Sequence, residues 1–194
     1  VTDYKLLAKP EVGQHFLCSE EAAEKIVSLG EISDEDKVLE IGSGAGSLSV
    51  FFTDHQADFT LVDIDESLVT KLQNDFSDYP NIHPLVQNAL KYDFSPFSVI
   101  IGNLPYYITS SLLERMALEA KSCKKAVLMV QKEAFARISA KTKTEDYGPL
   151  PILLSYVATL KREFNVPRDC FVPTPHVDST VFCLTFDKAA DFTL

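Results

Sequence analysis

Four consecutive residues, Asn103-Leu104-Pro105-Tyr106, combine an amide, a rigid turn and an aromatic ring in an order that suits chemistry on a nucleobase. The exocyclic amine of a base is a poor nucleophile, because its lone pair is conjugated into the ring. The Asn103 side-chain oxygen and the Leu104 carbonyl could accept both amine hydrogens and draw that lone pair out of conjugation. Pro105 fixes the turn, and Tyr106 offers a face on which an extruded base can stack. The motif therefore suggests methylation of an amine on a flipped base, while an ordinary strand-to-loop turn explains the same residues equally well.

The segment before this motif indicates where it should lie in the fold. Ser98-Val99-Ile100-Ile101-Gly102 is a short apolar run that ends in glycine, which is typical of a buried parallel strand. The motif then begins at the carboxyl end of that strand. Because ligands bind beyond the carboxyl ends of strands in open α/β sheets, we expect the motif at a ligand-binding edge.

A glycine-rich segment earlier in the chain predicts a second part of the same site. Lys37–Ile41 is typical of a strand, and it is followed by Gly42-Ser43-Gly44-Ala45-Gly46 and a helical segment, 47–52. Glycines permit positive φ and a close approach of the backbone to a ligand. The next strand, 59–62, ends at Asp63-Ile64-Asp65, where an acidic residue can bind ribose hydroxyls. Together with the downstream motif, this order of parts favours S-adenosylmethionine over a nicotinamide cofactor, which also uses glycine-rich loops.

The remaining periodic segments predict the elements that position these residues. Helices are expected, with Ser19 as one N-cap, at 19–29, 66–76, 110–120 and 149–159. Further strands are expected at 127–130 and 181–186. The alternation of strands with helices predicts an α/β fold, a doubly wound and mostly parallel sheet with helices on both faces. A length of 194 residues fits a single domain.

Further motifs lie along the chain in a fixed order. They are Gly13-Gln14-His15-Phe16-Leu17, the glycine-rich loop, Asp63, Asn88-Ala89 after the apolar segment Ile82–Val86, Asn103-Leu104-Pro105-Tyr106, and Phe171-Val172-Pro173-Thr174-Pro175-His176-Val177-Asp178-Ser179. In this order, from residue 13 to about 186, they resemble the rRNA adenine N6-dimethyltransferase family, the group that includes the KsgA and Erm enzymes. Gln131-Lys132-Glu133 and Tyr147-Gly148 also look like this family.

The resemblance implies roles for individual residues. The cofactor-binding residues would be Gln14, His15, Leu17, Gly42, Gly44, Asp63, Ile64, Asn88, Ala89 and Asn103. The catalytic residues would be Asn103, Leu104, Pro105, Tyr106 and Phe171, with the target base held between Tyr106 and Phe171. No metal site is apparent. The family usually has Asp where this chain has Asn88, and an amide accepts a hydrogen bond without charge assistance. We therefore expect weaker cofactor binding, which Asn88→Asp should improve.

The resemblance also implies a fold and an activity. The fold would be a Rossmann-like class I S-adenosylmethionine-dependent methyltransferase whose final strand is antiparallel, without the family's small helical C-terminal domain. The activity would be dimethylation of two adjacent adenines in a hairpin loop of small-subunit 16S rRNA, on a ribosomal subunit precursor. Leu104 and the F-x-P-x-P-x-V-D-S pattern from Phe171 favour this KsgA type over an Erm-type 23S rRNA methyltransferase.

Two other classes of function stay open. The protein could be a ribosome-assembly or transcription-associated RNA-binding module that retains the methyltransferase fold. It could also be an amine methyltransferase acting on DNA or on a protein glutamine, for which an N-P-P-Y variant of the motif is typical. Leu104 and the Gly13-Gln14-His15-Phe16-Leu17 signature disfavour the second alternative.

The charge of the chain is unusual for an RNA-binding protein. Phosphate contacts favour a basic protein, but the net charge here is -10. Residues 1–97 carry 6 Lys and Arg against 18 Asp and Glu, whereas residues 98–194 carry 12 against 10, so the half with the base-binding motifs is less repulsive. Candidate phosphate contacts are Lys121, Lys124, Lys125, Arg137, Lys141, Lys143, Lys161, Arg162 and Arg168.

Composition limits the setting in which the protein works. No apolar run approaches the roughly 20 residues that span a bilayer. The four cysteines form no C-x-x-C pair, so neither a zinc site nor a disulfide framework is indicated. We expect a cytoplasmic monomer with reduced cysteines and no membrane partner.

Overall fold

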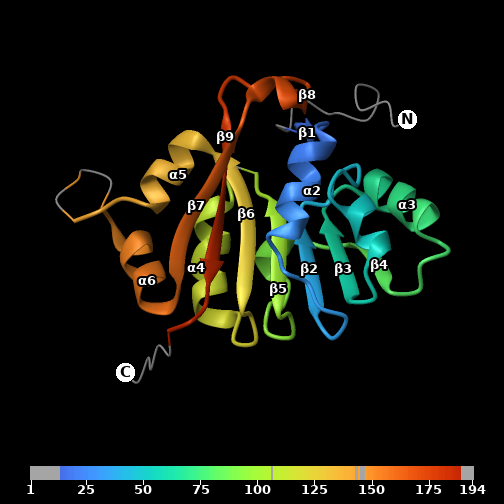
Figure 1. The fold of residues 1–194 in the computed structure, drawn as a ribbon, viewed down its shortest axis with the longest axis horizontal. Coiled ribbons are helices and arrows are strands. Elements are labelled where there is room, and N and C mark those ends of the chain that lie inside the picture. The colour runs from blue at the N-terminus through green and yellow to red at the C-terminus, as the bar shows by residue number, and fades with distance from the viewer. Residues whose placement is uncertain (1–13, 106, 143, 145–146, 189–194) are drawn as a thin grey trace.

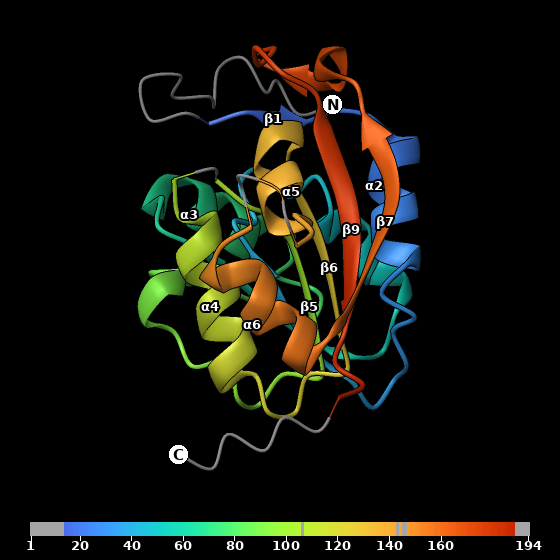
Figure 2. The same cartoon turned by 90° about the vertical axis from the view of Figure 1, so that its left-hand side faces the viewer.

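The computed structural model describes residues 14–105, 107–142, 144 and 147–188 (Figures 1 and 2). Three residues used in the sequence analysis, Gly13, Tyr106 and Lys143, lie outside the described residues. Within the described ranges, no helix is long and apolar enough to cross a membrane.

A seven-stranded sheet forms the centre of the molecule, in the order β4-β3-β2-β5-β6-β9-β7 (Figure 1). Its strands are β2 (Lys37–Ile41), β3 (Asp58–Asp63), β4 (Ile82–Val86), β5 (Val99–Asn103), β6 (Lys125–Gln131), β7 (Thr159–Val166) and β9 (Ser179–Thr185). The strands from β4 to β6 are parallel, and β9 pairs antiparallel with both β6 and β7. The predicted mostly parallel sheet and antiparallel last strand are therefore confirmed.

Helices cover both faces of the sheet (Figure 2). They are α2 (Glu20–Ser28), α3 (Glu66–Asp75), α4 (Thr109–Glu119), α5 (Lys132–Ile138) and α6 (Pro149–Val157), with short 3-10 helices η2 (Ser49–Asp54), η3 (Ala89–Lys91) and η4 (Arg168–Cys170). Burial of the alternate side chains of each strand against these two layers is what fixes the sheet in place.

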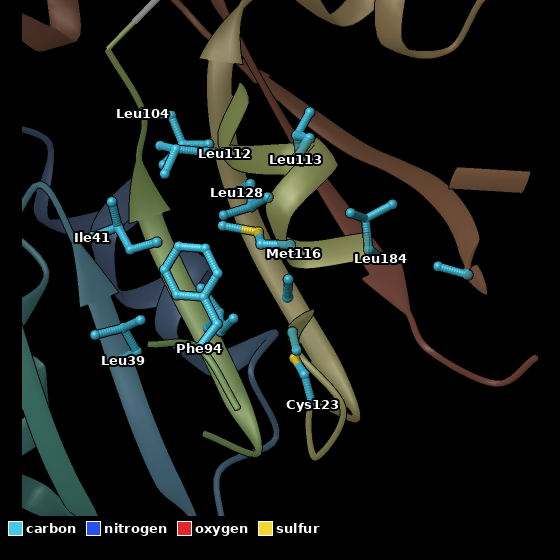
Figure 3. Close-up of a cluster of buried hydrophobic side chains, with 14 of the residues drawn as sticks. Leu39, Ile41, Phe94, Leu104, Leu112, Leu113, Met116, Cys123, Leu128 and Leu184 are labelled. Carbon is cyan, nitrogen blue, oxygen red and sulfur yellow. The ribbon is translucent and has the colours of Figure 1, made fainter. Parts of the chain in front are cut away.

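Two hydrophobic cores lie on opposite sides of the sheet. The α4-side core contains side chains of α4, α5 and α6 with alternate residues of the strands, including Leu39, Ile100 and Leu128. Figure 3 shows part of it, where Leu128 of β6 faces Met116 of α4. The α2-side core contains side chains of α2, η2 and α3 with the other set of strand residues, including Val38, Leu61, Ile101, Met129 and Val181.

Local capping explains why the predicted helices form where they do. The Ser19 side chain accepts a hydrogen bond from the Ala22 N–H at the start of α2, as predicted. Asp65 caps α3 in the same way through the Ser67 and Leu68 N–H groups. Helix α4 agrees with the predicted 110–120 to within one residue.

Two predictions were wrong in part. The segment 47–52 was expected to be a regular helix, but it forms only the 3-10 helix η2 from Ser49, since no side chain caps its start and His55 is already extended. The helix expected at 149–159 ends at Val157, because Thr159 begins β7 and pairs with Thr185 of β9. Strand β7 itself was not predicted, since its polar sequence suits an edge strand but lacks an apolar run.

A second, two-stranded sheet lies at the top of Figure 1, beyond the carboxyl ends of the parallel strands. It consists of β1 (Phe16–Leu17) and β8 (Phe171–Val172), paired antiparallel with Phe16 opposite Val172 and Leu17 opposite Phe171. This small sheet brings the first and last sequence motifs together.

Candidate active site

The carboxyl ends of four neighbouring parallel strands, and the amino end of the antiparallel strand β9 beside them, place polar side chains on one face of the sheet. These residues, which we call the polar row, are Asp63 (β3), Glu40 (β2), Asn103 (β5), Gln131 (β6) and Ser179 (β9). Each lies two residues from a member of the α2-side core on its own strand. Because residues two apart on a strand point to the same face, all five side chains share that face.

A cavity of about 940 Å³ lies over the polar row and is lined by all five of its residues. It is also lined by the glycine-rich loop, residues 14–17, Leu104, Pro105 and Phe171. A volume of this order is typical of a site for a cofactor together with part of a substrate. The structure thus brings together motifs that are far apart in the sequence.

The glycine-rich loop adopts the conformation that the sequence predicted. Gly42 and Gly44 have φ of +70° and +53°, which is the left-handed region that favours glycine. The Gly44 N–H donates a hydrogen bond to Asp63 Oδ2 at 2.9 Å, and a Cβ atom at Gly44 would lie 3.1 Å from the Phe16 ring. A side chain at Gly44 would therefore crowd the Phe16 ring and adopt a strained backbone conformation.

Asp63 is held in place by the backbone on both sides. Besides the contact with Gly44, its Oδ1 accepts a hydrogen bond from the Asp65 N–H at 2.9 Å. Burial raises the pKa of Asp63, while these two backbone N–H groups lower it. A carboxylate oxygen accepts more than one hydrogen bond, so Asp63 keeps acceptor capacity toward the cavity that it lines.

A second cavity of about 160 Å³ lies beside the first. It is lined by five of the predicted cofactor-binding residues, Gly42, Asp63, Ile64, Asn88 and Ala89, of which the first three also line the larger cavity. Ile64 is a large apolar residue that is 65% exposed here. The Asn88 side-chain oxygen accepts a hydrogen bond from the Leu90 N–H at 2.9 Å, so this residue also caps η3.

Residues 14–17, which we call the N-terminal strap, line the larger cavity beyond the carboxyl ends of the parallel strands. Gln14 Nε2 donates to Asp65 Oδ2 at 3.2 Å, and His15 Nδ1 lies 2.7 Å from the Pro173 carbonyl oxygen. Because a carbonyl can only accept, His15 Nδ1 carries a proton. Leu17 pairs with Phe171 and is 3% exposed. All three predicted strap residues line the larger cavity.

The backbone of the motif that begins at Asn103 is held by hydrogen bonds to β6 and α4. The Leu104 N–H donates to the Met129 carbonyl at 2.9 Å, and the Leu104 side chain is 4% exposed in the α4-side core. The Pro105 carbonyl accepts from Thr109 Oγ1 at 3.0 Å, which ties the turn to the start of α4. The Asn103 side chain makes no hydrogen bond to any residue within the described ranges, and it lines the larger cavity.

Phe171, the predicted partner of the target base, is 3% exposed and belongs to the α2-side core. It also lines the larger cavity, where it pairs with Leu17 of the same lining. Its role against a base is not tested by this geometry, and it stays a prediction, as does the role of Tyr106 outside the described residues.

The cavity includes residues that sequence reasoning missed. Glu40 is 1% exposed, its Oε2 accepts a hydrogen bond from Ser49 Oγ at 2.5 Å, and burial raises its pKa to about 8. The Ser43 hydroxyl is buried with no hydrogen-bond partner among the described residues. A charged residue inside the apolar run Lys37–Ile41 was a signal that could have identified Glu40, because charged residues are seldom buried without a partner.

The structure separates some of the candidate phosphate contacts from the cavity. Lys124 forms an ion pair with Asp36 at 2.8 Å, and Lys125 forms one with Glu31 at 2.7 Å. Both lysines lie at the start of β6, and thus at the amino edge of the parallel strands. That edge is opposite the cavity, so we withdraw Lys124 and Lys125 as contacts to a substrate bound there.

Comparison with known structures defines the class of fold. A dimethyladenosine transferase from Plasmodium falciparum superposes with a TM-score of 0.82 at 31% identity, covering 88% of this chain and 62% of that one. The 23S rRNA methyltransferase ErmE superposes with a TM-score of 0.77 at 28% identity, covering 90% and 71%. The fold is that of the Rossmann-like class I methyltransferases.

Sequence comparison defines the family. Residues 6–191 match the family described as ribosomal RNA adenine dimethylase, and the chain belongs to it. The chain is 38% identical to a ribosomal RNA small subunit methyltransferase A from Malacoplasma penetrans, over 97% of this chain and 70% of that protein. It is 40% identical to the protein of the same name from Thermotoga maritima, over 92% and 63%. The chain thus spans about two thirds of the length of these relatives.

Proposed function

We propose that this protein transfers methyl groups from S-adenosylmethionine to the N6 amine of adenine in small-subunit rRNA, dimethylating two adjacent adenines of a hairpin loop. The observation that carries the proposal is the Asn103 side chain, which has no hydrogen-bond partner among the described residues and lines the centre of the cavity. The glycine-rich loop and Asp63 lie on one side of it in the strand order, and Gln131 and Ser179 lie on the other. We also propose that the protein acts as a cytoplasmic monomer on a precursor of the small ribosomal subunit.

The residues present fit the proposed cofactor. Asp63 offers a carboxylate for ribose hydroxyls, and the smaller cavity with Ile64 and Asn88 has a size and lining that suit an adenine ring. The Ser43 hydroxyl is a buried polar group that lacks a partner among the described residues, and the left-handed glycines allow backbone N–H groups to approach a ligand. When bound, S-adenosylmethionine would supply a methyl group on a positively charged sulfur.

The proposed role of Asn103 is to hold the target amine. Its side-chain oxygen, with the Leu104 carbonyl, would accept the two amine hydrogens and release the lone pair from conjugation. The Leu104–Met129 and Pro105–Thr109 hydrogen bonds keep this pair of acceptors rigid. The gain in rate comes mainly from positioning and exclusion of water, so no strong base is required. Flipping the base costs a few kcal/mol of stacking, and Tyr106 and Phe171 could each return roughly 1–3 kcal/mol.

A transfer assay tests this proposal. Tritiated methyl transfer from S-adenosylmethionine to small ribosomal subunits that lack the modification is followed by nucleoside analysis. We expect dimethyladenosine with the wild-type protein and at least a hundredfold lower transfer with Asn103→Ala, because positioning is lost. Asn74→Ala is the matched control, since Asn74 is exposed on α3 and lies outside both cavities.

Calorimetry separates the alternatives. RNA binding should be nearly unchanged in Asn103→Ala if the residue acts on the target amine. A protein that works only by docking on RNA would be indifferent to Asn103→Ala and would transfer no methyl group. That result would contradict the proposed enzyme function.

A further inference from the structure

Gln131 lies beside Asn103 on the neighbouring strand. Asn103 of β5 pairs with Met129 of β6, and Gln131 is two residues farther along β6 toward the cavity. It is the last residue of β6, is partly buried and lines the larger cavity. Gln131, Asn103 and Met129 share one face of the sheet by alternation.

No structural role accounts for the Gln131 side chain. Gln131 occupies the N-cap position of α5, where Ser, Thr, Asp and Asn are preferred, and its side chain makes no capping hydrogen bond. The N–H that follows it, on Lys132, is instead bonded to the Asp178 carbonyl at 3.0 Å. Across the part of the chain that the structure describes, the Gln131 amide has no hydrogen-bond partner, so its donors and acceptor are available to a ligand.

The position of Gln131 in the polar row indicates which ligand it would meet. Asp63 and Glu40 lie on one side of Asn103 in the strand order, next to the glycine-rich loop. Gln131 and Ser179, which pair with each other, lie on the other side. If the cofactor occupies the first side and Asn103 holds the target amine, the rest of the base extends over Gln131.

We propose that Gln131 is a specificity-determining residue that donates a hydrogen bond from its side-chain amide to N1 of the target adenine. This inference rests on the proposed function. N1 is the ring nitrogen next to the carbon that carries the amine, and it is an acceptor in adenine. In guanine the same position carries a hydrogen and is a donor. An amide N–H facing that position therefore favours adenine.

The test combines a protein change with a change of one atom in the RNA. Small subunits are assembled in vitro on rRNA that carries adenine, 1-deazaadenine or 7-deazaadenine at both target positions. Transfer is measured with the wild type, Gln131→Ala and Gln131→Glu, the last of which keeps the shape but cannot donate when ionised. Gln56→Ala is the control, since Gln56 is an exposed glutamine that lines neither cavity.

We expect Gln131→Ala and Gln131→Glu to lower kcat/KM on adenine RNA about tenfold, with cofactor affinity unchanged by calorimetry. The wild type should lose about the same factor on 1-deazaadenine RNA, on which Gln131→Ala should cause no further loss. On 7-deazaadenine RNA the tenfold effect of Gln131→Ala should persist. The comparison of Gln131→Ala with the wild type is a ratio on one RNA, so a change in the intrinsic reactivity of the amine cancels in it.

Three results would overturn the proposal for Gln131. The first is transfer by Gln131→Ala at the wild-type rate on adenine RNA. The second is an undiminished effect of Gln131→Ala on 1-deazaadenine RNA, and the third is the loss of that effect on 7-deazaadenine RNA; either would refute contact with N1. Failure of the proposed function looks different, because the wild-type protein itself would then methylate none of the RNAs.

Discussion

A Cβ atom at Gly42 would lie 3.2 Å from the main-chain carbonyl oxygen of Asn103. The glycine-rich loop and the motif that begins at Asn103 therefore approach each other closely through their backbones, on adjacent parallel strands in which Ile41 pairs with Gly102. A change in one of them must move the other. This contact explains why a glycine is needed at this end of β2 independently of any ligand.

Gly42→Ala should damage the site more than the fold. The φ of +70° costs a non-glycine residue about 1–2 kcal/mol, and the added methyl group would displace the Asn103 carbonyl. We expect a modest loss of stability and at least a tenfold loss of methyl transfer, measured by urea unfolding and the tritium assay. Gly30→Ala is the control, because its added methyl group would crowd the Val27 carbonyl oxygen at a place that is not part of the cavity lining. Equal loss of transfer in both variants would contradict the argument.

Glu40 should make the stability of the protein depend on pH. Burial and the nearby charge of Asp63 raise its pKa from 4.5 to about 8, although the Ser49 hydroxyl lowers it. Between these two values the folded protein holds a proton that the unfolded chain has lost, so stability decreases as pH rises through this window. Glu40→Gln replaces the titrating carboxyl group with a neutral amide. The free energy of unfolding of this variant minus that of the wild type should therefore rise by up to a few kcal/mol from pH 5 to pH 8.5.

Urea unfolding at several pH values without cofactor measures this effect. Glu35→Gln, at an exposed position on the loop before β2, is the matched control and should show no such trend. A constant difference between Glu40→Gln and wild type across the pH range would show that Glu40 is ionised in the folded protein throughout.

Asn88→Asp should tighten cofactor binding. The Asn88 side-chain oxygen already accepts one hydrogen bond, from the Leu90 N–H, and it lines the smaller cavity. A carboxylate would keep that contact and accept a second hydrogen bond with charge assistance, which is the stronger kind. We expect a several-fold lower Kd for S-adenosylmethionine by calorimetry. An unchanged or higher Kd would argue against placing the adenine of the cofactor in this cavity.

Asp36 should matter for stability and not for the cavity. It is 5% exposed at the amino edge of the sheet, where it accepts hydrogen bonds from Ser33, Ser98 and Lys124. Asp36→Ala leaves these donors unpaired and should cost about 2–4 kcal/mol in urea unfolding. The Kd for S-adenosylmethionine should stay within twofold of wild type, as should that of the exposed control Asp34→Ala. A large change in Kd would show that the two edges of the sheet are coupled.

Much of this fold was predictable because its signals are local. The apolar runs of β2, β5 and β6 identified buried strands, and Ser19 indicated the start of α2. The glycine-rich loop, Asp63 and Asn103 were recognised because each follows a strand directly, and the carboxyl ends of parallel strands must meet at one edge of the sheet. The sequence by itself thus determined the fold class, the family and the centre of the candidate site.

Only the tertiary structure decided which distant residues share the cavity. The contacts of Gln14 with Asp65 and of His15 with Pro173 join segments that are 51 and 158 positions apart, and no local pattern encodes such pairs. Gln131 joins the site because β6 is next to β5, and Ser179 because β9 then pairs with β6. The pairing order of strands depends on how whole layers pack, which is a property of the complete chain. For that reason the polar row as a set, in which Glu40 and Gln131 lie on either side of Asn103, could be identified only once the sheet was assembled.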